Sequence, residues 1–265
     1  MAKAKTLTGL SRTREQQYQE RMTARIARRM DLAFQREIGK AMRALGEAHG
    51  NPGKQAMATV EHKQRLANLL RREYGVSFDL FGPRILREAP KHHAIVLETK
   101  AAQDEFDRAR QAWIEQYVAL KVTEIGGTTE KQAIAIIREA TQEAVREGIA
   151  SQAALGKLIQ SRITEQGGVM ARARSRVIAR TESHASANAA TQEAAKATGL
   201  PMMKEWVASR GARTRDDHAD ADGQTVPLDM PFVVGGEELM FPGDPRGSAE
   251  QVINCRCASV HVVAD

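Results

Sequence analysis

Aromatic residues are scarce in this sequence. Phe, Trp and Tyr together make up 4% of the 265 residues, although hydrophobic residues as a whole reach 42%. A β-sandwich core draws heavily on aromatic side chains, whereas long helices can pack through Leu, Ile, Ala and Met. The composition therefore predicts a mostly helical protein that is large enough to bury a core.

Cysteine and long apolar runs are also nearly absent. The two cysteines, Cys255 and Cys257, are separated by one residue. A disulfide between them would close a strained ring, so we expect free thiols and a reducing compartment. No apolar run approaches the roughly 18 residues of a membrane span, and the start MAKAKTLTGL lacks the apolar segment of a signal peptide. We therefore expect no membrane partner and synthesis in a cytoplasm.

Positive charge is concentrated at the front of the chain. The formal net charge is +6, and residues 1–40 alone hold ten cations against four anions. Such a basic arm suits a polyanion, because each neutralised phosphate releases counterions. The predicted contacts to double-stranded DNA are Arg21, Arg25, Arg28 and Arg29. The alternative is a merely solvated helix face.

Hydrophobic spacing predicts a series of helices before residue 200. Apolar residues recur every three or four positions in the ranges 11–48, 55–74, 90–125, 130–147, 151–163 and 169–199. Glycines predict breaks between them at Gly75, at Gly126 and Gly127, and at Gly167 and Gly168. Thr128 or Thr129 is the expected cap of the helix that starts at 130.

Beyond Pro201 the pattern changes to a period of two. Strands are predicted over 202–208, 224–226, 237–240 and 258–263. The expected fold class is therefore α+β. A helical N-terminal region with the basic arm (1–127) precedes a C-terminal domain (128–265) of helices packed on a small antiparallel sheet.

Cys255 and Cys257, together with His218, are candidate zinc ligands, and His184 or His261 could complete the set. These are the residue types of Cys₂His₂ sites and of Cys₂His sites with bound water. The alternative is that both cysteines are small residues packed at the edge of the sheet.

Four aspartates surround His218 in the sequence: Asp216, Asp217, Asp220 and Asp222. Carboxylates beside a histidine can serve metal-assisted or acid–base chemistry, which favours a metal-dependent hydrolase or nuclease as an alternative function. Asp-rich turns that end in Asp-Gly also occur for backbone reasons alone, because aspartate bonds nearby amides and glycine accepts a positive φ.

Four segments together resemble the phage Mu F-like, or SPP1 gp7-like, minor head proteins. They are ARTESHASANAA (179–190), KEWVASRGARTRDDHADADGQTVP (204–227), PFVVGGEELMFPGDP (231–245) and INCRC (253–257). The residues that carry this resemblance are Arg180, Glu182, Trp206, Arg213, Arg215, His218, Asp222, Gly223, Asp244, Asn254 and Arg256. Gly211 and Ala212 depart from the pattern, since an acidic residue often precedes the Arg-Thr-Arg triplet.

The resemblance implies a structural role in head morphogenesis. Such proteins are minor capsid components at the portal vertex of tailed phages, where they act in procapsid assembly and in DNA packaging or ejection. The implied partners are the portal protein, double-stranded DNA and the major capsid or scaffolding proteins. The implied location is the virion, after assembly in the host cytoplasm. Similar modules are fused to polymorphic toxins, so we expect a binding domain that needs no cofactor beyond the zinc considered above.

Overall fold

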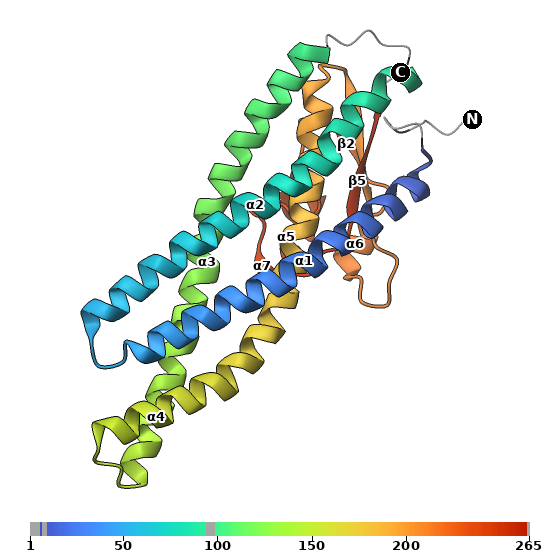
Figure 1. Ribbon diagram of the computed structural model, residues 1–265. Helices are drawn as coiled ribbons and strands as arrows, with labels where there is room; N and C mark the ends of the chain where they lie inside the picture. The colour runs from blue at the N-terminus through green and yellow to red at the C-terminus, as the bar shows by residue number, and fades with distance from the viewer. Residues whose placement is uncertain (1–5, 7–9, 94–98, 264–265) are drawn as a thin grey trace. The chain divides into compact units, whose positions relative to one another are not determined.

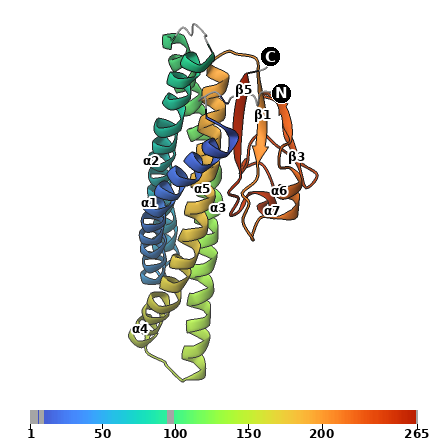
Figure 2. The same ribbon diagram turned by 90° about the vertical axis from the view of Figure 1, so that its right-hand side faces the viewer.

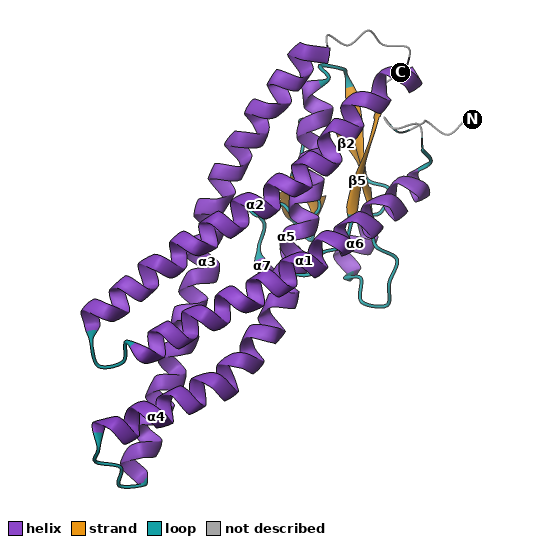
Figure 3. Ribbon diagram, in the orientation of Figure 1, coloured by secondary structure: helices purple, strands orange, loops and turns teal. Residues whose placement is uncertain are grey.

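The computed structural model describes residues 6, 10–93 and 99–263 (Figure 1). The helices are α1 (Arg12–Glu47), α2 (Pro52–His93), α3 (Thr99–Arg146), α4 (Gln152–Arg162), a π-helical turn (Ile163–Gly167), α5 (Gly168–Ala197), α6 (Asp216–Asp220) and α7 (Ala249–Val252). The strands are β1 (Met202–Val207), β2 (Thr225–Pro227), β3 (Phe232–Val234), β4 (Glu237–Leu239) and β5 (Ala258–Val263). Long helices followed by a small antiparallel sheet confirm the predicted α+β class (Figure 3).

The chain forms two compact units that share the long helices. Unit 1 consists of Met1–Arg28, Glu73–Ile114 and Val177–Asp265, and unit 2 consists of Arg29–Arg72 and Glu115–Arg176. The boundary predicted at residues 127 and 128 is a different kind of division, along the sequence, and it stays a prediction. Within the described residues, no helix combines the length and the apolarity needed to cross a membrane.

Unit 2 is built on the predicted apolar stripe of α1. Met30, Phe34, Ile38 and Met42 are all buried, which confirms their role as core positions. Small residues allow close approach here: a Cβ added at Gly167 would lie 2.9 Å from the sulfur of Met42. The unit is therefore a helical assembly held mainly by apolar packing.

The helix break predicted at Gly75 is wrong, because α2 continues to His93 through Gly82 and Pro83. The apolar pattern of α2 also continues, and Tyr74 and Phe78 are fully buried. A Cβ added at Gly82 would lie 1.9 Å from Cζ of Phe106, so this glycine lets α3 approach the backbone of α2. Tertiary packing thus outweighs the weak helix propensity of glycine.

The breaks at Gly126 with Gly127 and at Gly167 with Gly168 are also wrong. α3 runs through the first pair, and the hydroxyl of Thr129 donates to the carbonyl of Ile125 within the helix instead of capping a new one. The second pair lies where the π-helical turn passes directly into α5. Helices do end at glycines whose φ is positive, namely Gly148 (φ 68°) and Gly199 (φ 67°).

In unit 1 the sheet lies alongside the C-terminal half of α5 (Figure 2). β1 is the central strand and pairs antiparallel with β2 and β5, while β3 and β4 form a separate hairpin. The four predicted strands are confirmed, whereas β3, α6 and α7 were not predicted. The core under the sheet contains Trp206, Phe232 and Leu239 together with both cysteines.

Candidate functional site

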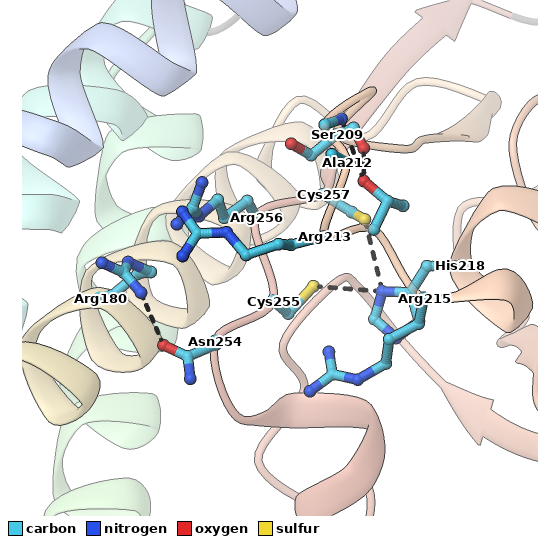
Figure 4. A pocket seen from close by; sticks show the side chains of 12 residues that line it. Arg180, Ser209, Ala212, Arg213, Arg215, His218, Asn254, Cys255, Arg256 and Cys257 are labelled. Atoms are coloured by element: carbon cyan, nitrogen blue, oxygen red, sulfur yellow. Dashed lines mark hydrogen bonds between the residues drawn. The ribbon is translucent and has the colours of Figure 1, made fainter.

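A cavity of about 500 Å³ opens in unit 1 beside the start of β5. Its walls come from α5, from the loop between β1 and α6, and from the segment just before β5 (Figure 4). The lining residues are Arg180, Ser209, Gly211, Ala212, Arg213, Thr214, Arg215, His218, Asn254, Cys255, Arg256 and Cys257. Six of the residues that carry the motif resemblance, and all three principal zinc candidates, therefore meet in one place.

His218 is held in a defined orientation at one wall of this cavity. It lies on α6 and is 2% exposed. Its Nε2 is 2.9 Å from Oε1 of Gln251, and the amide nitrogen of Gln251 donates to Asp217 at 3.0 Å. Because Asp217 orients the amide of Gln251, the amide oxygen accepts a hydrogen bond from Nε2–H of His218, which leaves the lone pair of Nδ1 free.

That lone pair faces both cysteines. Nδ1 of His218 is 3.4 Å from Sγ of Cys257 and 3.7 Å from Sγ of Cys255, and the three candidate ligand atoms all lie within 4.8 Å of one another. Two ligands of a tetrahedral zinc ion are about 3.5 to 3.8 Å apart. The group therefore has the donor types, the tautomer and nearly the spacing of a zinc site. It does not include His184 or His261.

The two thiols differ in acidity. The pKa of Cys257 is lowered to about 5 by a hydrogen bond from the Cys255 thiol, with further help from the backbone amide of Ser209. The pKa of Cys255 is raised, because it donates that bond and is buried beside the resulting charge. Cys257 is thus held as a thiolate near neutral pH, which is the form that binds metal ions.

Four arginines line the rest of the cavity. Arg180 donates to the side-chain oxygen of Asn254 at 2.9 Å, and Arg215 donates to the carbonyl of Ile253 at 2.6 Å. Figure 4 shows the guanidinium groups of Arg213 and Arg256 next to each other, with Arg180 on the same side of the cavity. Arg256 and Arg213 add to the effect of burial in lowering the pKa of Arg180, so like charges crowd this wall.

Comparison with known protein families identifies part of the chain. Residues 135–260 match the model for phage Mu protein F like proteins. The chain carries a phage Mu F-like domain. The resemblance read from the four motifs is thereby confirmed.

Three curated proteins are similar to part of this chain. The chain is 36% identical over 89 residues to NAD(+)--arginine ADP-ribosyltransferase EFV of Enterococcus faecalis, which is 32% of this chain and 18% of that protein. It is 35% identical over 96 residues to YqbB of Bacillus subtilis, which is 35% of this chain and 32% of that protein. It is 36% identical over 97 residues to minor head protein GP7 of Bacillus phage SPP1, which is 34% of this chain and 30% of that protein. Each match covers about a third or less of the relative, and no solved structure matches significantly.

The aspartates of the Mu F-like domain do not join His218 at the cavity. Asp222 accepts hydrogen bonds from Arg12 at 2.6 Å and from the amide of Ala208 at 2.8 Å, which ties the loop after β1 to α1. Asp217 reaches His218 only through Gln251. Asp216 and Asp220 are exposed. Among the described residues that line the cavity, none is a carboxylate.

Other motif residues of the Mu F-like domain shape its backbone. Asp244 is fully buried and accepts from the amide of Met240 at 2.9 Å, which fixes the Pro-Gly-Asp-Pro turn. Gly223 has a φ of 84° and Asn254 a φ of 60°, both in the left-handed region. Glu182 accepts from the hydroxyl of Tyr74 at 2.6 Å, and the ring of Trp206 packs edge-on against His218. These residues position the cavity walls.

Sequence reasoning missed the roles of three buried polar residues of this domain. Gln251 orients His218, and Lys204 donates to the carbonyl of Met240 at 2.6 Å from inside the core. The amide of Asn188 donates to the carbonyls of Pro242 and Cys257, and its oxygen accepts from the amide of Ser259. Asn188 could have been found, because it is a polar residue on the Arg180 and His184 face of an otherwise alanine-rich helix.

The proposed DNA contacts lie elsewhere in the protein. Arg21, Arg25, Arg28 and Arg29 are exposed on α1, as a binding face requires. Lys3 and Lys5 of the basic arm lie outside the described residues. DNA binding by this face stays a prediction.

Proposed function

We propose that this protein is a minor component of a phage head and acts in head assembly at the portal vertex. The Mu F-like match and the similarity to a minor head protein support this role. The observation that carries the proposal is that the motif residues have structural roles. Asp222, Asp244 and Asn254 hold turns, and the cavity offers cations without a carboxylate base. Such a domain works by binding.

The principal partner in this proposal is the portal protein, with the major capsid or scaffolding protein as further contacts. The test is to probe gradient-purified procapsids and mature heads for this polypeptide, alongside co-expression with the portal protein and affinity capture. We expect it in both particles and in the captured complex. Heads and procapsids that both lack the protein would refute the proposal. Presence in heads without capture by the portal would refute the location alone.

The second contact in the proposal is with double-stranded DNA through α1. Arg21, Arg25 and Arg28 recur every three or four residues, so they share one exposed face of the helix. The logarithm of the binding constant for duplex DNA falls linearly with the logarithm of the salt concentration. Each phosphate that an arginine neutralises makes this slope steeper by about 0.9.

The DNA contact can be tested with two matched triple variants. Replacement of Arg21, Arg25 and Arg28 by Gln is expected to weaken duplex binding and to reduce the salt slope by about 2 to 3. The control replaces Lys131, Arg138 and Arg146, three exposed cations of α3, and removes the same charge. Equal losses in both variants would show attraction to net charge without a binding face.

We also propose that His218, Cys255 and Cys257 hold a zinc ion. It would link α6 to the segment that leads into β5, with the fourth position facing the cavity. The support is the free lone pair on Nδ1 of His218, the Cys257 thiolate, and the hydrogen bond by which Gln251, itself held by Asp217, orients the imidazole. An ion in this position would stabilise the fold by tying together segments 37 to 39 residues apart in sequence.

Elemental analysis of the purified full chain tests the zinc site. We expect about one zinc per chain, lost when Cys255 and Cys257 are both replaced by Ser. The matched control is His184→Gln, a histidine outside the ligand group, which should retain the metal. If the wild-type chain stays free of zinc after reloading with the metal, the cysteines are simply buried thiols.

A metal-dependent hydrolase remains the second candidate because three protein ligands beside a cavity are also typical of catalytic zinc sites. One relative is, moreover, named as an enzyme. The positions of the aspartates argue against a hydrolase, because Asp217 binds Gln251 and Asp222 binds Arg12. DNA cleavage assayed with added zinc decides between the two. Turnover that disappears in His218→Ala would replace the binding role with catalysis.

A further inference from the structure

The cavity concentrates positive charge that the described protein does not neutralise. Arg180, Arg213, Arg215 and Arg256 all line it, and within the described residues none of the four forms an ion pair with Asp or Glu. Elsewhere in unit 1 the arginines do find carboxylates: Arg12 binds Asp222, and Arg84 binds Glu15. Among the described residues of unit 1, the half-buried arginines outside the cavity thus pair with carboxylates, whereas those that line the cavity do not.

Such an arrangement is costly without an anion. Arg180 and Arg256 are half-buried, and the charges of Arg256 and Arg213 both repel that of Arg180. The same two half-buried arginines add to burial in lowering the pKa of the nearby His184 to about 4, so that histidine is neutral at pH 7. Four such charges without a carboxylate partner favour a ligand that neutralises them.

We propose that this cavity binds a phosphate group, through Arg213, Arg256 and Arg180 with the side-chain amide of Asn254 beside them. Guanidinium groups present planar pairs of N–H donors that match the oxygens of a phosphate. A phosphate dianion neutralises two positive charges, whereas a carboxylate neutralises one. A volume of about 500 Å³ is within the usual range for small-molecule sites and holds a nucleotide-sized ligand.

This inference goes beyond the head-assembly role and does not require zinc. The cysteines and His218 occupy one side of the cavity, and the guanidinium groups of Arg180, Arg213 and Arg256 lie on the other (Figure 4). The three are carried by α5, the loop after β1 and the segment before β5, so the phosphate would bridge all three walls. A bound phosphate would therefore also stiffen the loop over 208–215.

Calorimetric titration of the full chain with inorganic phosphate tests the proposal. We expect saturable binding at one site, weakened at least tenfold in Arg213→Gln and in Arg256→Gln, because each loses charge-assisted hydrogen bonds. Arg213→Lys keeps the positive charge but loses the planar pair of N–H donors. Its affinity for phosphate should therefore lie between those of wild type and Arg213→Gln. The matched control is Arg108→Gln, an exposed cation outside the cavity, with wild-type affinity expected.

Arg213 is exposed in a loop, so its replacement is expected to leave the fold intact even if Arg256→Gln does not fold. The proposal is overturned if the wild-type chain shows no saturable phosphate binding, or if Arg213→Gln binds as tightly as Arg108→Gln. Neither result depends on whether the protein is found in phage heads.

A second set of titrations identifies the source of the phosphate. The ligands are a duplex with 5′-phosphates and the same duplex without them, each with wild type and with Arg213→Gln. An effect of Arg213→Gln restricted to the phosphorylated duplex assigns the cavity to DNA ends. An equal effect on both duplexes assigns it to internal phosphodiesters. An effect with inorganic phosphate but with neither duplex assigns it to a free phosphate ligand.

Discussion

The two compact units bury different kinds of side chains. Among the described residues, the buried polar side chains of unit 2 are His62, Lys121, Thr129 and Ser175. Unit 1 buries many more, and they form connected sets: Asn188 bonds three backbone groups, and Gln251 links His218 to Asp217. Each such group costs free energy unless it is bonded, so unit 1 depends on specific partners.

This contrast indicates that unit 2 is a scaffold, whereas unit 1 carries the candidate site. Apolar packing tolerates substitution as long as volume is conserved, whereas a polar network fails when one member is removed. We therefore expect the largest effects of mutation in unit 1, near the cavity, and small effects on the exposed faces of unit 2.

Asn188→Ala should give the largest loss. It leaves two carbonyls and one amide without their partner in a buried region, so the free energy of unfolding should fall by about 3 to 5 kcal/mol. Urea unfolding monitored by circular dichroism measures it. The control in unit 2 is Val145→Ala, at a side chain that is 76% exposed, with a change within about 0.5 kcal/mol. Similar losses at both positions would abolish the contrast between the units.

Lys204 should make unit 1 sensitive to pH. Its side chain is fully buried, and burial, aided by Lys196, lowers its pKa to about 7. The unfolded chain then binds more protons than the folded one between pH 7 and about 10.5, so stability rises with pH over that window and is lowest below pH 7.

The effect is isolated by comparing wild type with Lys204→Met. The difference in the free energy of unfolding between the two should shift in favour of wild type by a few kcal/mol from pH 6.5 to pH 10. Unfolding curves at several pH values check this. Parallel pH profiles for the two proteins would mean that Lys204 stays charged inside the fold.

Gly82→Ala should destabilise unit 1 by about 1 to 3 kcal/mol, because the added methyl group overlaps the buried ring of Phe106. Thermal unfolding measures the change. Since alanine otherwise favours a helix, a stabilised variant would show that α2 and α3 are further apart at this point.

The smallest expected effect has the opposite sign. Gly127 lies inside α3 in unit 2, where an added Cβ would meet nothing within 4 Å. Gly127→Ala should therefore stabilise the protein by about 0.5 to 1 kcal/mol through helix propensity alone. A loss of stability would mean that the helix is broken at this position after all.

The glycines show most clearly where prediction from sequence failed. Gly75 and Gly127 were both expected to mark breaks, yet both lie inside helices, as does Gly82. Absence of a Cβ permits a break, a left-handed cap or a close contact with a neighbouring helix. The choice depends on a side chain such as Phe106, which lies 24 residues further along the chain. No local pattern contains that information.

The candidate site was predicted in part. The spacing of Cys255 and Cys257 and the ligand chemistry of His218 were visible in the sequence, and the structure brings the three together. The aspartates beside His218 were equally suggestive, but Asp217 and Asp222 bind other partners, and Asp216 and Asp220 are exposed. Neighbours along a chain need not share a site, because the backbone of α6 and its flanking turn sends their side chains in different directions.

The sequence by itself determined the buried stripe of α1, the places of the four predicted strands and the Mu F-like motifs, since each is written within a short stretch of residues. The tertiary structure alone decided which glycines end helices, which groups surround His218, and that four arginines from separate segments face one cavity. Local periodicity fixes which way a side chain points. The atoms that it meets come from distant parts of the chain, and only folding brings them within bonding distance.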